Sequence, residues 1–412
     1  MLLQDLPHSV LVLIFELYAF EVHPASENRS AGTATCYSSL TDSRIQSVTP
    51  LLTLNRRLGA ACADVQSQFA APGTVAQFVQ WASSLADDRR ASRVRWLIVD
   101  VGASGDGADE RIAAALLFAL PQLRNLHTLE LVSVVRQADL VKQAITRWTS
   151  VRTLAVRSRQ ERTVEGCVAL RQLYSAAHSS LRSLTIEGMR VEDVGFDDMP
   201  NQWPTLLALD ISSCSAWLPT AARITSRCPR LRLLVLDSDI DDDYDDDDDE
   251  EITSAQLWAV VAPVAATLRG FYFACSGGLD DDGVLEDGSG VYDSIIARAS
   301  GLRLFYVPSF EVGLSMAMLR KLPGTLTHVG IKHPGIADVS LIMRLVTQSA
   351  LRHLALSPLS GLECGIIEVC GPQRLTLTPP GRLPAIWRSA TLDKLLDRRD
   401  SERGHGVRRD PM

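Results

Sequence analysis

The residues that most often carry out catalysis or hold metal ions occur here without the spacing that such chemistry needs. Residues 102–107 (GASGDG) lack the glycine spacing of a dinucleotide-binding turn and the Lys-Ser/Thr pair of a phosphate-binding loop. The chain has no Gly-x-Ser-x-Gly nucleophile turn, and its eight histidines include no His-x-x-x-His pair for a metal ion. We therefore expect a protein that is not an enzyme and that holds neither a cofactor nor a metal.

Most of the net negative charge comes from one acidic run. Twelve acids lie within residues 237–251: Asp237, Asp239, Asp241, Asp242, Asp243, Asp245, Asp246, Asp247, Asp248, Asp249, Glu250 and Glu251. Removing these twelve from the 49 acidic residues leaves 37, against 41 lysines and arginines, so the net charge of −8 belongs to this run. Like charges repel and bury no apolar area, so we expect a solvated, disordered loop there. The balanced remainder predicts no nucleic-acid partner.

A repeated hydrophobic motif indicates the fold that positions these groups. The pattern L-x-x-L-x-L, with conservative substitutions, starts at Val94, Leu126, Val151, Leu181, Leu206, Leu231, Leu268, Leu302, Leu326 and Leu351. The copies lie 24 to 37 residues apart, and the longest interval contains the acidic run. A doubtful eleventh copy ends at residues 374–377. Because the last apolar residues of each copy alternate, each copy predicts a short strand with one buried face.

The segments between the copies show helical periodicity. Examples are residues 112–120, 140–148, 168–176, 257–265 and 339–346. A unit of one strand and one helix cannot bury its apolar face alone, whereas stacked copies bury a continuous core. A doubly wound sheet also alternates strands and helices. The recurrence of one spaced motif favours the stacked arrangement.

Over residues 94–377 the chain resembles the leucine-rich-repeat family of the strand-plus-helix kind. The resemblance implies an α/β solenoid with parallel strands inside and helices outside. Asn or Cys often stands three residues after the motif in that family; here Cys214 fits, whereas Gly102, Met189 and Phe310 occupy the place in other copies. The repeats therefore belong to a divergent class with irregular turns.

Two amphipathic segments precede the repeats. Pro7 suits the first turn of a helix, and the apolar residues that follow at helical spacing are Leu6, Val10, Leu13, Ile14 and Leu17. After a Ser/Thr-rich stretch (residues 24–50), a second set recurs every three or four residues: Leu51, Leu54, Leu58, Ala61, Val65 and Phe69.

Residues 6–69 resemble the F-box, through Leu6-Pro7, Ile14-Phe15 and the LNRRL sequence at residues 54–58. With the repeats, the chain is similar to divergent, fungal-type F-box proteins with leucine-rich repeats. The resemblance implies docking onto a Skp-family adaptor of a cullin–RING ubiquitin ligase. The implied adaptor-binding residues are Leu6, Pro7, Val10, Leu11, Ile14, Phe15, Leu51, Leu54, Arg56, Arg57 and Leu58. The alternative is that the two helices only cap the first repeat; the segment TVAQFVQWASSL (residues 74–85) is a second candidate for that cap.

The third and fifth residues of each copy are expected to face the concave side of the solenoid. The candidate target-binding residues there are Trp96, Leu233, Val235, Tyr272, Leu304, Tyr306, His328 and His353. Five of them fall on three consecutive strands and predict a contiguous apolar patch with two tyrosines. The alternative is that the acidic run or the carboxyl-terminal tail covers this patch.

The second residue of seven copies is arginine: Arg95, Arg152, Arg182, Arg232, Arg269, Arg303 and Arg352. Stacked strands would align them in a row that binds acidic or phosphorylated partners, or that the acidic run of the same molecule neutralises. The interpretation we favour is structural, with the arginine stems lying on the edge of the core and the guanidinium groups in solvent.

The cysteines and the hydropathy pattern bear on the location of the protein. Eight cysteines without a Cys-x-x-Cys pair are too few for a disulfide scaffold, so we expect reduced, buried thiols and a cytoplasmic or nuclear protein. No window reaches the roughly 18 uncharged apolar residues of a membrane span, and we expect no membrane partner.

These observations predict four regions. Residues 1–70 form the F-box-like helical segment, and residues 71–93 form a linker and capping helix. Residues 94–380 form the solenoid with the acidic insertion 237–251, and residues 381–412 form a carboxyl-terminal helix and a disordered tail. The expected function is substrate recognition for an SCF-type (Skp–cullin–F-box) ubiquitin ligase. The alternative is a protein-binding scaffold with no link to ubiquitin.

Overall fold

The computed structural model describes residues 60–61, 63, 67–72, 74–85, 91–100, 108–132, 151–157, 180–187, 203–212, 217–237, 252–274, 284–307, 322–326, 328–331, 353–356, 366–369 and 375–378. The chain divides into two compact units. One comprises residues 1–35, 39–65 and 381–412, of which only residues 60–61 and 63 are described, all of them helical. The other comprises residues 36–38 and 66–380 and contains every element discussed below.

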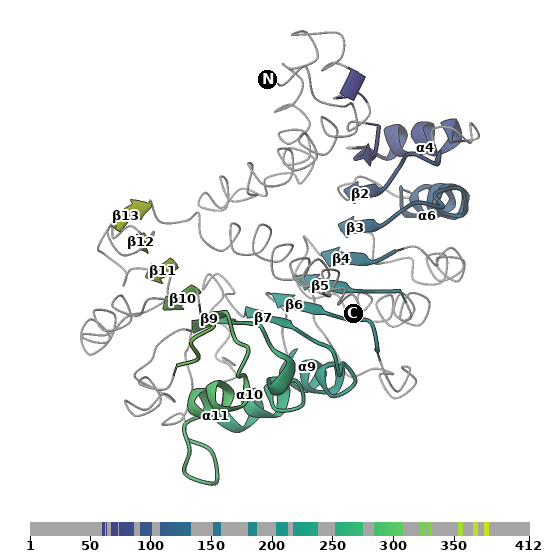
Figure 1. Ribbon diagram of the computed structural model, residues 1–412. Helices are drawn as coiled ribbons and strands as arrows, with labels where there is room; N and C mark the ends of the chain where they lie inside the picture. The colour runs from purple at the N-terminus through teal and green to yellow at the C-terminus, as the bar shows by residue number, and fades with distance from the viewer. Residues whose placement is uncertain are drawn as a thin grey trace, which may run out of the picture. The chain divides into compact units, whose positions relative to one another are not determined.

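Each of the ten predicted copies forms a strand that begins at the third residue of its motif. The strands are β2 (Trp96–Asp100), β3 (Thr128–Val132), β4 (Thr153–Arg157), β5 (Ser183–Glu187), β6 (Ala208–Ser212), β7 (Leu233–Asp237), β8 (Gly270–Ala274), β9 (Leu304–Val307), β10 (His328–Ile331) and β11 (His353–Leu356). Neighbouring strands are parallel, and their order in the sheet is their order along the chain (Figure 1). A doubly wound sheet reverses its strand order at a switch point. The observed order excludes that alternative and agrees with a solenoid.

The first, fourth and sixth residues of the motif form the core. On β2 to β9 the fourth and sixth side chains are at most 2% exposed, and they extend from Leu97 and Val99 to Phe305 and Val307. Strand alternation places these two positions on one face of the sheet. The rings of Phe271 and Phe305, on neighbouring strands, lie 5.9 Å apart between centroids within this core. The hydrophobic motif is therefore the sequence signature of burial on one sheet face.

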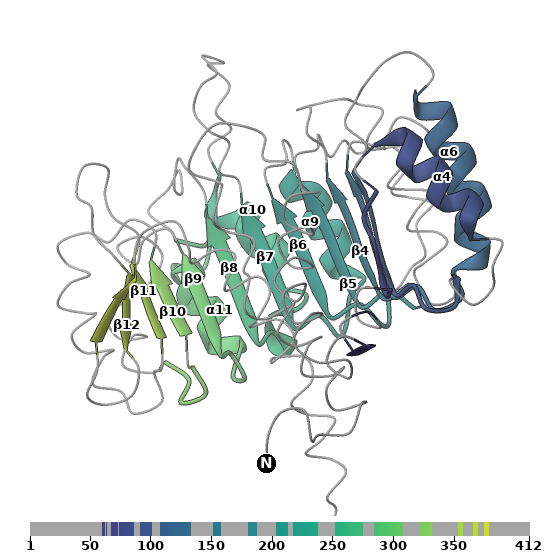
Figure 2. The same ribbon diagram turned by 90° about the horizontal axis from the view of Figure 1, so that it is seen from above.

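Helices cover that same face. They are α4 (Val75–Ser84), α6 (Ala108–Ala119), α9 (Trp217–Ser226), α10 (Ser254–Val261) and α11 (Val291–Arg298), with short 3₁₀ turns η3 (Leu120–Gln122) and η5 (Ala265–Thr267). Figure 2 shows α9, α10 and α11 behind the strands. Their buried apolar residues, such as Ile224, Leu257 and Ile295, join the strand side chains in one cluster. The helical periodicities at 112–120 and 257–265 are thus confirmed, as is the helix at 74–85; those at 140–148, 168–176 and 339–346 lie outside the described residues.

Two helices begin at threonines that cap them. The Thr74 Oγ1 accepts a hydrogen bond of 3.2 Å from the Gln77 backbone N–H. At α10 the Thr253 Oγ1 accepts from the Gln256 N–H, and the Gln256 Oε1 accepts from the Thr253 N–H at 2.8 Å. This reciprocal capping satisfies N–H groups that have no partner inside a helix.

A recurrent hydrogen-bond pattern joins the strands where they begin. We call this side of the sheet, formed by the amino-terminal ends of the strands, its amino-terminal edge. The second-position carbonyl of one copy accepts two N–H groups from the next: His127 O accepts from Arg152 N (2.8 Å) and Thr153 N (3.0 Å). The hydroxyl just before the motif adds a third bond. The Oγ1 of Thr267 donates to Leu231 O at 2.6 Å, and Ser180, Thr205 and Thr325 donate likewise to Val151, Leu181 and Leu302. We call these four side chains the hydroxyl row; the sequence analysis did not anticipate it.

Two elements differ from the predicted pattern. The predicted helical periodicity that ends at Phe69 is wrong at this last residue. Phe69–Ala70 forms strand β1, which pairs in parallel with β2. The Phe69 ring stacks on Trp96 at 5.7 Å, a contact with a residue 27 positions away. The doubtful eleventh copy contributes β13 (Leu375–Thr378), which pairs antiparallel with β12 (Ile366–Val369) in a separate two-stranded sheet. It is therefore not a further strand of the parallel sheet.

Replacing Thr267 by valine tests the hydroxyl row. Thr267→Val keeps the side-chain shape but leaves the Leu231 carbonyl without its hydroxyl donor, so we expect a loss of about 1–2 kcal/mol in unfolding free energy. Urea unfolding of the full-length chain measures it. The matched control is Thr185→Val, because Thr185 lies on the face of β5 that points away from the helices. This change should alter the unfolding free energy by less than about 0.5 kcal/mol. Equal losses in both variants would contradict a structural role for the row.

Candidate protein-binding surface

The sheet face opposite the helices, here called the inner face, carries two continuous columns of equivalent motif positions. The third-position column is Trp96, Thr128, Thr153, Ser183, Ala208, Leu233, Gly270, Leu304, His328 and His353. The fifth-position column is Ile98, Glu130, Ala155, Thr185, Asp210, Val235, Tyr272, Tyr306, Gly330 and Ala355. Each residue is paired in register with the same motif position of its neighbour. The predicted alignment of these positions is confirmed.

The structure brings together five predicted target-binding residues, which we call the apolar patch: Leu233, Val235, Tyr272, Leu304 and Tyr306. Tyr272 and Tyr306 stack with centroids 4.3 Å apart and an interplanar angle of 11°. Gly270 makes room for the side chain of Leu233, since a Cβ at Gly270 would collide with it. All five side chains are only 3–7% exposed. The patch is thus contiguous but closed to solvent, and its contact with a target stays a prediction.

The remaining predicted target-binding residues lie elsewhere on the inner face. Trp96 is half-buried against Phe69 on the first full-length strand, five strands away from Leu233. His328 and His353 pair in register beyond Leu304. The acidic run and the tail, which were the candidate covers of the apolar patch, lie outside the described residues apart from Asp237. Between Trp96 and the patch, half-buried Glu130, Thr185 and Asp210 give the inner face a polar section.

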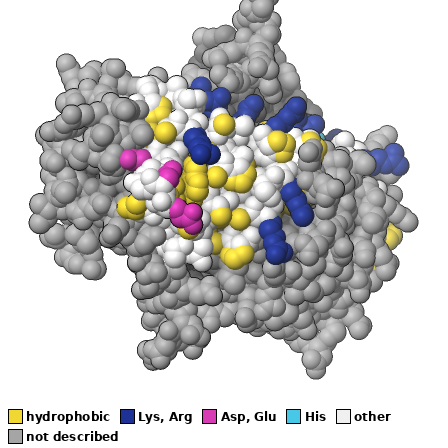
Figure 3. All heavy atoms as spheres, turned by 90° about the horizontal axis from the view of Figure 1, so that it is seen from below, with side chains coloured by type: hydrophobic (Ala, Val, Ile, Leu, Met, Phe, Trp, Pro, Cys, Tyr) yellow, Lys and Arg dark blue, Asp and Glu magenta, His cyan; other side chains and the backbone are white. Residues whose placement is uncertain are grey.

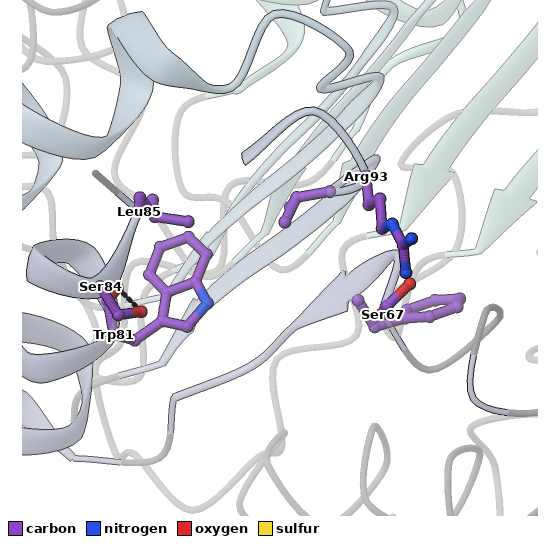
Figure 4. A pocket seen from close by; sticks show the side chains of 7 residues that line it. Ser67, Trp81, Ser84, Leu85 and Arg93 are labelled. Carbon is purple, nitrogen blue, oxygen red and sulfur yellow. Dashed lines mark hydrogen bonds between the residues drawn. The ribbon is translucent and has the colours of Figure 1, made fainter. Parts of the chain in front are cut away.

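A pocket that the sequence analysis missed lies beside the first strands. Its volume is about 470 Å³, and its lining residues are Ser67, Phe69, Trp81, Ser84, Leu85, Arg93 and Val94. Figure 4 shows Trp81 of α4 and Leu85, the residue that caps this helix, on one side, and Arg93 with Ser67 on the other. The lining combines aromatic and aliphatic surface with one permanent cation, so it suits binding rather than acid–base chemistry. No local pattern signals it, because residues from three separate segments form it.

Arginines gather along the amino-terminal edge of the sheet. The six-residue windows that run from four residues before each motif to its second residue contain no Asp, Glu or Lys, but fourteen arginines. We call the eleven of them that the structure describes the basic edge: Arg93, Arg95, Arg124, Arg152, Arg182, Arg227, Arg230, Arg232, Arg269, Arg298 and Arg303. In Figure 3 several dark-blue side chains lie along the upper margin of the described surface, with others lower on the same face, and the magenta acidic groups lie toward its left side. The sequence analysis found only the second-position arginines and missed this wider segregation.

His127 lies within the basic edge and reports its electrostatic field. It occupies the second motif position on the strand between those of Arg95 and Arg152, and the backbone joins all three. Partial burial lowers the pKa of His127, and the positive charges of Arg152 and Arg95 lower it further. The neutral imidazole is therefore favoured at this edge.

Some of these arginines have structural contacts. The Arg269 guanidinium occupies the space where a side chain at residue 301 would lie, which accounts for Gly301. The Arg298 guanidinium lies 4.7 Å from the ring centroid of Trp258, a cation–π contact between α11 and α10. By contrast, Arg152 and Arg182 are exposed on neighbouring strands.

The described residues offer little reactive chemistry. Cys228 is fully buried, its thiol donates to the Ile224 carbonyl, and burial raises its pKa to about 12, so it is not a thiolate nucleophile. Within the described part of the chain, no group of three His, Cys, Asp or Glu side chains is placed to hold a metal ion. Across the same residues, no helix has both the length and the hydropathy to cross a bilayer. The predicted adaptor-binding residues Leu6 to Leu58 lie outside the described residues.

Comparisons with known proteins leave the family open. No family model matches the chain, and no curated protein matches it. Among solved structures, a chain from the crystal structure of the Rad7 and Elc1 complex in yeast is similar, with 12% identity over 84% of this chain and 75% of that chain, at a TM-score of 0.39. This similarity is too low to assign a family.

Removing Arg152 should restore a more ordinary titration of His127. Arg152→Gln deletes the larger of the two charge effects, so the pKa of His127 should rise. A pH titration of the imidazole resonances by NMR measures the pKa. Arg111→Gln on α6 removes an equally exposed charge away from this edge and should leave the pKa unchanged. A pKa that does not rise in Arg152→Gln would mean that the two side chains are not neighbours in solution.

Proposed function

We propose that this chain is a protein-binding adaptor whose inner face holds a target protein. The observation that carries the proposal is the register of the ten strands, which aligns equivalent side chains into continuous columns. Ten strands about 4.8 Å apart span about 43 Å, and five residues span about 16 Å, which gives a face of roughly 700 Å². With the apolar patch included, that area is close to the ~800 Å² that each partner buries in a specific complex.

The half-buried section of the inner face provides suitable contact groups. Trp96 offers an aromatic anchor, and Glu130 and Asp210 offer carboxylates within the same two columns. Binding sites of this kind combine a few large anchors with polar groups that fix orientation. The apolar patch would join this surface once it is uncovered.

The more specific proposal is that the adaptor serves an SCF-type ubiquitin ligase in the cytoplasm or nucleus. The F-box-like pattern of residues 6–69 supports it, since such a module docks on a Skp-family adaptor and thereby on a cullin scaffold. The solenoid would then present the target for ubiquitination, without catalysis by this chain. In the alternative, a scaffold with no ubiquitin link, residues 6–69 serve only as a cap.

Capture of a purified Skp-family adaptor separates the two functions. Leu6→Ala/Pro7→Ala/Ile14→Ala should weaken capture by the full-length chain by about tenfold or more, because it removes predicted anchors of the docking helix. The control Pro24→Ala/Leu40→Ala/Ile45→Ala changes the same three residue types in the Ser/Thr-rich stretch and should bind normally. If the unaltered chain captures no adaptor, the scaffold function stands instead.

A charge placed on the inner face tests target binding. Thr185→Arg puts a bulky cation in the middle of the fifth-position column. The proteins that bind the inner face should then be labelled about tenfold less, or more weakly still, in a proximity-labelling experiment. Ala259→Arg, on the exposed side of α10, adds the same residue on the helical side and should leave the partner set intact. Loss of the same partners in both variants would argue against the inner face.

A further inference from the structure

We infer that the basic edge binds an acidic, extended segment of a partner protein, with Arg152 and Arg182 as its central contacts. The inference rests on the proposed function, since it gives the partner chemistry of a protein-binding module. It adds a second surface, at the strand ends rather than on the inner face.

The first step is charge segregation. The ten windows that define the basic edge contain fourteen arginines and none of the chain's 49 acidic residues, although the whole chain carries a net charge of −8. If the acidic residues were distributed at random along the chain, some of them would lie in these windows and neutralise nearby arginines. Here the windows themselves provide no compensating carboxylate.

The second step is geometry. Arg182 N donates to Arg152 O at 2.7 Å, and Arg152 N donates to His127 O at 2.8 Å, so the three residues occupy successive strands about 4.8 Å apart. Both guanidinium groups are exposed. Among the residues that the structure describes, no carboxylate forms an ion pair with either of them. The edge thus offers adjacent forked donors to a ligand that runs across the strands.

The third step is the electrostatic response of a neighbour. Partial burial lowers the pKa of His127, and the positive charges of Arg152 and Arg95 lower it further. An anionic ligand would relieve this charge. The titration of His127 thus supports what the geometry indicates.

The arginine composition indicates the partner chemistry. Every cation of the ten windows is arginine rather than lysine, and the planar guanidinium fork matches a carboxylate with two parallel hydrogen bonds. A nucleic acid would also neutralise the row, but its long, uniform run of phosphates needs a more extended basic surface than one row of arginines. An acidic protein segment places its charges locally and is therefore favoured.

Fluorescence anisotropy with a labelled ten-residue polyglutamate peptide tests the inference on the full-length chain. Arg152→Gln/Arg182→Gln should weaken binding by about tenfold or more, and raised salt should weaken binding to the unaltered chain. Arg182→Gln alone should weaken it by about threefold or more, whereas the matched control Arg111→Gln should change it by less than about twofold. If the thermal unfolding midpoint of the double variant is unchanged, weaker binding results from lost contacts with the peptide and not from unfolding.

Three outcomes would overturn the inference. They are no binding of polyglutamate by the unaltered chain, equal effects of Arg111→Gln and Arg182→Gln, or tighter binding of a labelled oligothymidine than of polyglutamate. Adaptor capture by the double variant separates this inference from the proposed function. If the double variant loses peptide binding but still captures the Skp-family adaptor, the result concerns the basic edge alone. If the chain binds the peptide but captures no Skp-family adaptor, the result concerns the ligase role alone.

Discussion

Every strand of this sheet depends on the preceding strand for the hydrogen bonds at its start. One carbonyl at the second motif position accepts two N–H groups of the next strand, as His127 does from Arg152 and Thr153. A tight turn cannot join two neighbouring parallel strands, because the chain must first return to the end of the sheet where strands begin. Each copy therefore needs a connection about as long as a helix before its next strand pairs. This constraint sets the repeat, keeps the register and aligns equivalent positions in columns.

The same register gives three motif positions three different environments. The fourth and sixth residues meet the helices and become core, the third and fifth form the inner face, and the second lies at the edge. The hydroxyl row works within this scheme, because Thr267 and its equivalents satisfy a carbonyl that the strands leave at their start. A side chain therefore acquires its role from its place in the motif rather than from its sequence neighbours.

The two surfaces that result differ in accessibility and charge. The apolar patch around the stacked Tyr272 and Tyr306 is nearly closed to solvent, whereas Arg152 and Arg182 are exposed. The acidic run begins at Asp237, the last residue of β7, at the opposite end of that strand from Arg232. On β7 an arginine thus precedes the strand, and the first acid of the run ends it. Charge placed in this way steers an oppositely charged partner toward one edge.

The sequence by itself determined the ten strands, their chain order and the residues that share a column, because apolar alternation and motif spacing are local and repeat. It also determined helix α4, whose Thr74 cap and apolar spacing are local signals. Tertiary structure alone decided that Phe69 joins the sheet by stacking on Trp96, that β13 pairs antiparallel with β12, and that the apolar patch is closed. It also decided the pocket. The stacking of Phe69 on Trp96, the pocket and the closed patch depend on residues distant in sequence, and burial exists only once such residues have been brought together.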